Sequence, residues 1–138
     1  MAGSDSEAGD DPGRHLALDR APQWEFGLKG LRKELLNFAT CGPVVQEVLQ
    51  GLGHDPASEA FREGLLALPI LSDPLPNAAF LSAAEIYRLG QAKGYTIRSS
   101  TDCLIAAIAI DNGVPVWHKD RDFKSIARFT GLRTKPFR

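Results

Sequence analysis

The chain has 138 residues, a length that suits one domain able to bury about two-thirds of its surface. Hydrophobic residues make up 43% of the sequence, and no apolar run approaches the roughly 20 residues of a membrane span, so we expect no membrane association. The net charge of −1 is uneven, because residues 1–82 carry 6 basic and 12 acidic side chains while residues 83–138 carry 10 and 5.

A basic half of this kind fits either a phosphodiester substrate, whose phosphates Lys and Arg neutralise, or a solvated charged surface. Cys41 and Cys103 lie in apolar surroundings without metal-ligand spacing, which predicts two reduced, buried thiols rather than a disulfide. The N-terminal residues lack a basic stretch followed by an apolar core, so we expect no secretory signal. These observations predict a cytoplasmic protein.

The N-terminal part of the chain contains a predicted tail and a predicted first strand. Residues 1–13 are small, acidic and nearly without apolar side chains, so they cannot offset their ordering entropy. We expect a flexible acidic tail there and a single domain over residues 14–138. Residues 15–19 (HLALD) predict a short strand that ends in Asp19. A helical stretch is expected to open at Pro22.

The next predicted unit is a strand over residues 38–41 followed by a helix. Pro43 fits the first turn of that helix, where its missing N–H costs nothing. Apolar residues at helical spacing form one face of it: Val44, Val45, Val48, Leu49 and Leu52. Glu47 lies between them and is either a partly desolvated functional carboxylate or an ordinary boundary residue.

Two more helices are predicted before the richest stretch of sequence. The first covers residues 56–68, and residues 69–71 then allow a short strand before a Pro-Leu-Pro turn. Ser82 is predicted to cap the second helix, with Glu85 three residues later completing a capping box. That assignment makes Glu85 structural, and Gly94 is expected to end the helix.

Residues 98–123, RSSTDCLIAAIAIDNGVPVWHKDRDF, combine a helix, a tight turn, a strand and an acidic loop. Asp102 falls in the first turn of a helix that is apolar on more than one side, and an Asn-Gly pair ends it. Residues 114–117 predict a short buried strand that leads to Asp120 and Asp122. Ligands of α/β sheets bind beyond the carboxyl ends of strands, so these carboxylates can converge on one spot.

We therefore predict an acidic metal site formed by Asp19, Glu47, Asp102 and Asp120, with Asp122 next to it. Several like charges within a few ångströms repel strongly unless a cation neutralises them. Hard cations such as Mg²⁺ take oxygen ligands, and Mn²⁺ fits the same set. One or two ions there would activate water for attack on a phosphodiester.

Each candidate also has a structural interpretation. Asp102 fits a capping acid favoured by the helix dipole, and Asp122 fits a helix cap or accessory acid. Ser99 either hydrogen-bonds a carboxylate or phosphate or simply caps the helix. His118 is either a polar contact to a ligand or carboxylate or a general base.

The stretch resembles the C-terminal half of the PIN domain, in particular the VapC-type toxin nucleases of bacterial toxin–antitoxin pairs. Residues 99–107 are close to S-x-x-D-x-x-I-A-A, and residues 118–123 are close to T/H-x-D-x-D-F. Residues 41–51 and 83–88 also look like that family. The resemblance extends from about Cys41 to Arg133.

The resemblance implies an α/β, PIN-like three-layer fold with a mostly parallel central sheet of about four or five short strands flanked by helices. It implies a Mg²⁺-dependent endoribonuclease toxin, held inactive by a cognate antitoxin and expected as a homodimer. Glu47 would be an essential acid, and Asp120 rather than Asp122 would be the ligand. Family chains begin with a strand, an Asp, a small hydroxyl residue and another apolar run. Asp19 lacks that continuation, so either it supplies the first acid or that acid is absent.

Two other functions fit parts of the sequence. A PIN-like protein without the first acid would be catalytically impaired and would retain only antitoxin or RNA binding. A phosphatase of another α/β family would need a nucleophilic Asp with apolar support after an early strand, which residues 16–22 provide poorly. A dinucleotide-binding fold is excluded because no G-x-G-x-x-G follows a strand.

Overall fold

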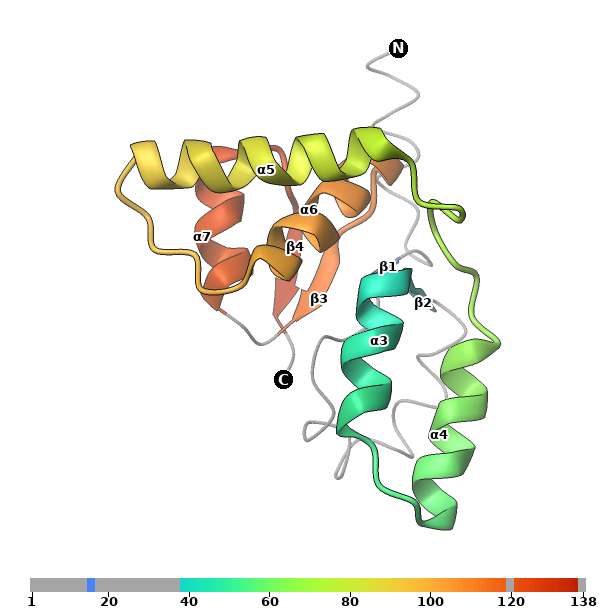
Figure 1. Ribbon diagram of the computed structural model, residues 1–138. Coiled ribbons are helices and arrows are strands. Elements are labelled where there is room, and N and C mark those ends of the chain that lie inside the picture. The colour runs from blue at the N-terminus through green and yellow to red at the C-terminus, as the bar shows by residue number, and fades with distance from the viewer. Residues whose placement is uncertain (1–14, 17–37, 119–120, 137–138) are drawn as a thin grey trace.

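The computed structural model describes residues 15–16, 38–118 and 121–136, and the account below concerns those residues. The helices and strands follow in chain order (Figure 1): β1 His15–Leu16, β2 Phe38–Ala39, α3 Gly42–Gly51, α4 Pro56–Leu66, α5 Asn77–Ala92, α6 Ser100–Asn112, β3 Val116–His118, α7 Arg121–Phe129 and β4 Thr134–Pro136. The predicted tail and the helix expected from Pro22 lie outside the described residues.

The four described strands form one parallel sheet in the order β2-β1-β3-β4. Strand β1 is central, since Leu16 pairs with Ala39 on one side and with Val116 on the other. The predicted α/β fold with a mostly parallel sheet of short strands is thus confirmed. Strand β3 begins two residues later than predicted, because the Val114 N–H donates to the carbonyl of Ala109 at the end of α6 instead of to a neighbouring strand.

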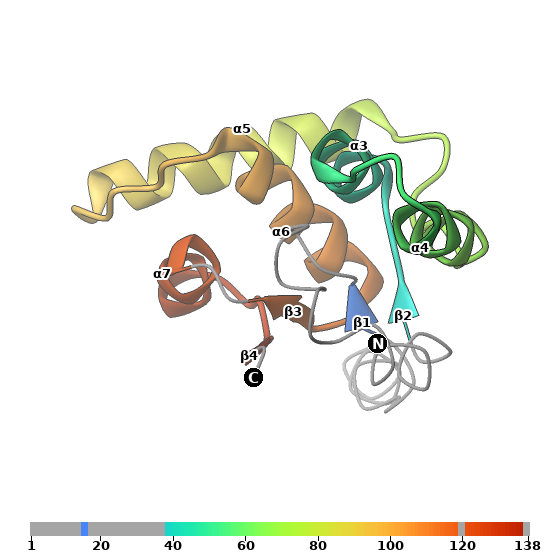
Figure 2. The same ribbon diagram turned by 90° about the horizontal axis from the view of Figure 1, so that it is seen from below.

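Helix α6 is the centre of the hydrophobic core. Seven of its residues are buried, on several sides of the helix: Asp102, Cys103, Ile105, Ala106, Ala107, Ile108 and Ala109. Figure 2 shows α6 running across the strands, with α5 on the far side of α6 from the sheet. A helix enclosed in this way must be apolar nearly all round, as its sequence is. Among the described residues, no helix is long and apolar enough to cross a membrane.

Two predicted local signals set helix ends, and a third cap, together with an end of α4 at Leu66 instead of residue 68, was not predicted. Pro43 lies in the first turn of α3, and Gly113 ends α6 in the left-handed conformation with φ 66°. The Asp55 carboxylate caps α4 by accepting from the Ser58 N–H at 2.9 Å. The short strand expected at residues 69–71 is present as a single parallel bridge between Thr40 and Ile70.

The predicted capping box at Ser82 is wrong. Helix α5 begins at Asn77, directly after Pro76, so Ser82 and Glu85 lie inside the helix and both are exposed. The residues just before Ser82 are good helix formers, and extending the helix through them packs Ala79 against the core. The packing gained by the longer helix outweighs one side-chain cap.

Gly90 lies at a close approach between α5 and its neighbours. A Cβ added there would lie 2.8 Å from Ile97 Cδ1 and 2.9 Å from Phe129 Cζ. We expect Gly90→Ala to lower the free energy of unfolding by up to about 2 kcal/mol, because overpacking costs about 1–3 kcal/mol and a gain of about 1 kcal/mol in helix propensity offsets only part of it. Urea denaturation measures this change.

Gly42→Ala is the matched control for that variant. Gly42 is also helical, and its added Cβ would meet nothing within 4 Å. The control should therefore be neutral or stabilising by less than about 1 kcal/mol. If Gly90→Ala were stabilised as much as the control, the close packing of α5 against Phe129 would be contradicted.

Candidate active site

Three described helices begin at the same edge of the sheet, the edge formed by the carboxyl ends of the strands. Helix α3 starts directly after β2, and α7 starts directly after β3. Helix α6 leads into β3 through a short turn, so its first turn also lies at this edge (Figure 1). Asp102 lies in the first turn of α6 and Asp122 in the first turn of α7, so both lie at this edge. Glu47 lies near it too, in the second turn of α3. This is the edge where parallel sheets bind ligands.

Asp102 is buried at this edge, with only 3% of its surface exposed. Its charge and that of Asp122 both act on Cys103. Burial first, then the negative charges of Asp102 and Asp122, raise the pKa of the Cys103 thiol to about 11. Because both carboxylates affect the pKa of the same thiol, Asp102 and Asp122 lie in the same acidic region although they are 20 positions apart in the sequence. Cys103 is a free, buried thiol, as predicted.

Asp122 connects the start of α7 to the segment before α6. Its Oδ2 accepts hydrogen bonds from the backbone N–H groups of Arg98 at 3.0 Å and Ser99 at 3.1 Å. The side chain is 3% exposed. One of its two oxygens is therefore engaged in fixing the backbone that leads into Asp102. This supports the accessory role considered for Asp122, and its role as a metal ligand stays a prediction.

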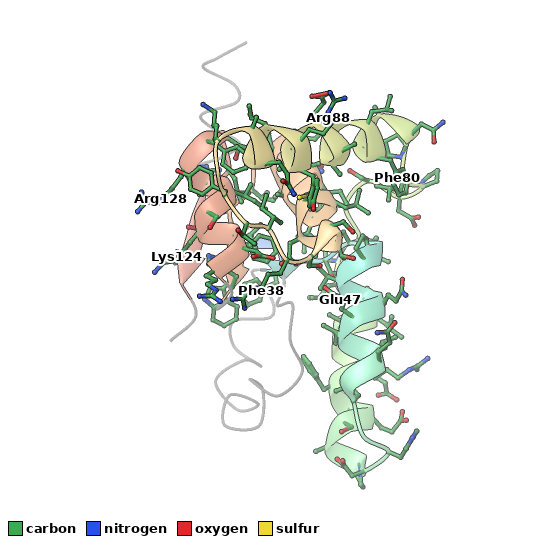
Figure 3. All side chains as sticks on the ribbon, turned by 60° about the vertical axis from the view of Figure 1, so that its left-hand side comes forward. Phe38, Glu47, Phe80, Arg88, Lys124 and Arg128 are labelled. Carbon is green, nitrogen blue, oxygen red and sulfur yellow. The ribbon has the colours of Figure 1, made fainter. Side chains whose placement is uncertain are left out.

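Glu47 lines a cavity of about 530 Å³ between α3, the first half of α6 and the start of α5. Figure 3 shows Glu47 at the boundary between α3 and α6, with Phe80 above it on α5. The side chain is half-buried, and its charge adds to the dominant effect of burial in raising the pKa of Cys41 to about 11. Half-burial fits both interpretations of Glu47, a partly desolvated functional carboxylate and an ordinary boundary residue, so its role at the site stays a prediction. Thr101, the neighbour of Asp102, lines the same cavity.

Of the four remaining candidate residues, the structure describes two. His118 is buried on β3, with its ring 5.2 Å from the ring of Phe123. Ser99 occupies the N-cap position of α6, where its side chain makes no capping hydrogen bond, and its role at the site stays a prediction. Asp19 and Asp120 lie outside the described residues. Within residues 15–16, 38–118 and 121–136, no three His, Cys, Asp or Glu side chains form a group that could hold a metal ion.

Sequence reasoning missed two features of this region. Gln46 and Gln50 line the cavity beside Glu47, and their spacing of four along α3 could have indicated a shared face. The outer face of α7 is basic, with Arg121, Lys124 and Arg128 all exposed at spacings of three and four. The second signal was readable once a helix was assigned to these residues.

The family model of the PIN domain matches residues 19–129. The chain belongs to the PIN-domain family. The chain is similar to VapC ribonuclease Mb1587 of Mycobacterium bovis and to ribonuclease VapC11 of Mycobacterium tuberculosis, and the match covers 80% of the length of each. Each is 39% identical over 109 residues, or 78% of the present chain. The resemblance inferred from residues 41–133 is thereby confirmed.

Solved structures support the same fold. The PIN domain resembles a chain of VapBC-5 from Mycobacterium tuberculosis with a TM-score of 0.62 and 20% identity, covering 92% of this chain and 99% of that one. It resembles a chain of VapBC2 from Rickettsia felis, solved with a promoter DNA fragment, with a TM-score of 0.61 and 16% identity over 91% and 99% of the two chains. At these identities the likeness shows the fold alone.

Proposed function

We propose that this PIN domain is a metal-dependent endoribonuclease, the toxin of a VapBC-type toxin–antitoxin pair. The observation that carries the proposal is its 39% identity to VapC ribonucleases over a region that includes Glu47 and Asp102. The geometry supports it, because Asp102 is buried at the carboxyl edge of a parallel sheet with Asp122 and Glu47 on neighbouring helices.

The donor chemistry fits a hard divalent cation, since carboxylate oxygens are the ligands that Mg²⁺ and Mn²⁺ prefer. Glu47 and Asp102 would hold it, together with Asp120 and Asp19, which follow the neighbouring strands β3 and β1 in the sequence. Bound there, the cation would supply activation of a water molecule and neutralisation of charge on the phosphate. Asp122 would keep the backbone before α6 in place, and so position Asp102.

The basic side chains near this edge of the sheet fit an RNA substrate. Arg121, Lys124 and Arg128 present three cations on one face of α7, the helix whose first turn contains Asp122 (Figure 3 labels two of them). Such a face binds backbone phosphates and positions the strand without reading its sequence. A protein antitoxin is the expected partner, because structural neighbours of this chain come from VapBC pairs. A homodimer and a cytoplasmic location complete the proposal.

Cleavage of RNA by the purified protein tests the proposal. We expect internal cuts in single-stranded RNA, with loss of at least about 100-fold in rate when EDTA removes the metal, since metal chemistry supplies the nucleophile. Mg²⁺ or Mn²⁺ added in excess should restore the rate. Gel analysis of a labelled oligoribonucleotide measures it, with heat-denatured protein as the control.

An absence of metal-dependent cleavage under these conditions would contradict the enzyme assignment. If the same protein still bound an antitoxin or RNA, the catalytically impaired binding protein would replace the nuclease as the proposed function.

A further inference from the structure

The cavity that Glu47 lines also contains residues to which the proposed cleavage reaction assigns no role. Its walls come from α3, α6, the loop before α5 and the start of α5: Gly42, Pro43, Gln46, Glu47, Gln50, Leu75, Phe80, Thr101 and Leu104. The volume of about 530 Å³ falls within the range of about 300–1,000 Å³ typical of pockets for small organic groups. The lining combines apolar walls with a few polar groups, which is the usual composition of a specificity pocket.

The two glutamines offer a defined hydrogen-bonding edge. Gln46 Nε2 donates to Gln50 Oε1 at 3.1 Å between two exposed side chains, and this hydrogen bond favours one mutual orientation of the two amides. The pair leaves the Gln46 carbonyl oxygen as an acceptor and the Gln50 amide N–H as a donor. A neighbouring acceptor and donor complement the edge of a nucleobase, which is how glutamine reads bases in nucleic acids.

Phe80 provides an aromatic surface at the rim of the same cavity. Half of its surface is exposed, although it is a large apolar side chain on a helix with a well-packed inner face. Unpaired RNA bases bind proteins by stacking on such rings while their edges are hydrogen-bonded. A base stacked on Phe80 would add to the affinity for RNA, which accounts for an exposed aromatic residue at this position.

The cavity borders one of the candidate metal ligands. Glu47 lines it directly, and Thr101 on its wall precedes Asp102. A base held there would belong to a nucleotide next to a phosphate at the carboxylates. An extended peptide is favoured less, because its main chain could use the amide pair but would leave the ring of Phe80 without a flat partner, whereas an unpaired base can use the amide pair at its edge and the ring on its face.

We propose that the Gln46, Gln50, Phe80 cavity is a nucleobase pocket that selects the base flanking the RNA bond to be cut. This inference rests on the proposed ribonuclease function and goes beyond it by assigning sequence preference to particular residues. Phe80 stacks on the base, and the glutamine pair reads its edge. The phosphates are held separately by the basic face of α7.

The test uses oligoribonucleotides randomised around the cleavage site and the full-length protein. Wild type should prefer one base at one flanking position, and Gln46→Ala with Gln50→Ala should reduce that preference about tenfold, as expected for the loss of a bidentate contact. Gln91→Ala, a glutamine at the other end of α5 that bonds Tyr87, is the matched control and should leave the preference unchanged.

Phe80 is tested with a substrate that lacks the base at the preferred position. Phe80→Ala should weaken RNA binding about tenfold, as expected for a lost stacking contact, and should have no further effect on the abasic RNA. Leu89→Ala, another exposed apolar residue of α5, is the control. Affinity is measured by fluorescence anisotropy with EDTA present, which does not depend on cleavage.

The outcomes separate this inference from the function it rests on. An inactive protein whose affinity still depended on Phe80 and the base would contradict the nuclease and retain the pocket. An active nuclease with unchanged base preference in both variants would overturn the pocket. Loss of antitoxin affinity with unchanged RNA discrimination would overturn it as well, and would assign the cavity to the protein partner.

Discussion

Replacing Asp102 by Asn is expected to lower the rate of RNA cleavage at least about 100-fold while leaving the protein folded. Loss of a residue that only hydrogen-bonds a metal ligand already lowers metal affinity or activity about 10–100-fold, so loss of a direct ligand should lower the cleavage rate at least as much. The free energy of unfolding should change by less than about 1 kcal/mol, because the lost attraction to the start of α6 is offset by reduced repulsion from the other acidic side chains of the candidate site. Cleavage assays and urea denaturation on the same preparation measure both quantities.

Asp111→Asn is the control for this variant, because Asp111 lies on the same helix and is exposed at its far end. The control should retain the wild-type rate. If Asp102→Asn also retained EDTA-sensitive cleavage, the assignment of the acidic site to the start of α6 would be wrong.

The largest effect on stability is expected at Asp122. Asp122→Ala removes the acceptor of two backbone N–H groups, those of Arg98 and Ser99, from a side chain that is 3% exposed. The loss should lower the free energy of unfolding by about 2–4 kcal/mol, since hydrogen bonds to a charged group contribute about 1.5–3 kcal/mol each and water replaces them in part. Asp122→Asn should cost about half as much, because a neutral carbonyl still accepts.

Urea denaturation of the two variants gives the comparison, with Glu85→Ala on the exposed face of α5 as the control. The control should stay within about 0.5 kcal/mol of wild type, as surface substitutions do. Equal stabilities for Asp122→Ala and the control would mean that the two hydrogen bonds contribute nothing net. Asp122 would then be available for the metal role considered from the sequence.

The elements that the sequence predicted well are those with local signals. Gly113 adopts the left-handed conformation at the end of α6, and Pro43 occupies the first turn of α3, because each residue's own backbone favours that position. The start of α5 was missed because Ser82 offered a local cap, while the observed helix is extended by packing of Ala79 against residues far away in the sequence.

The candidate site also has features that follow from local sequence signals and features that depend on tertiary packing. The amino-acid sequence by itself indicated that Asp102 opens a buried apolar helix and that a short strand follows it, although that strand was predicted to end at Trp117 and the structure extends it to His118. Only the tertiary structure decided that Asp122 accepts from the backbone 23 and 24 positions earlier, and that Gln46 and Phe80 line one cavity with Glu47. The physical reason is that helix caps and periodicity act within a few residues, whereas hydrogen bonds between helices and the walls of a cavity depend on how separate elements pack.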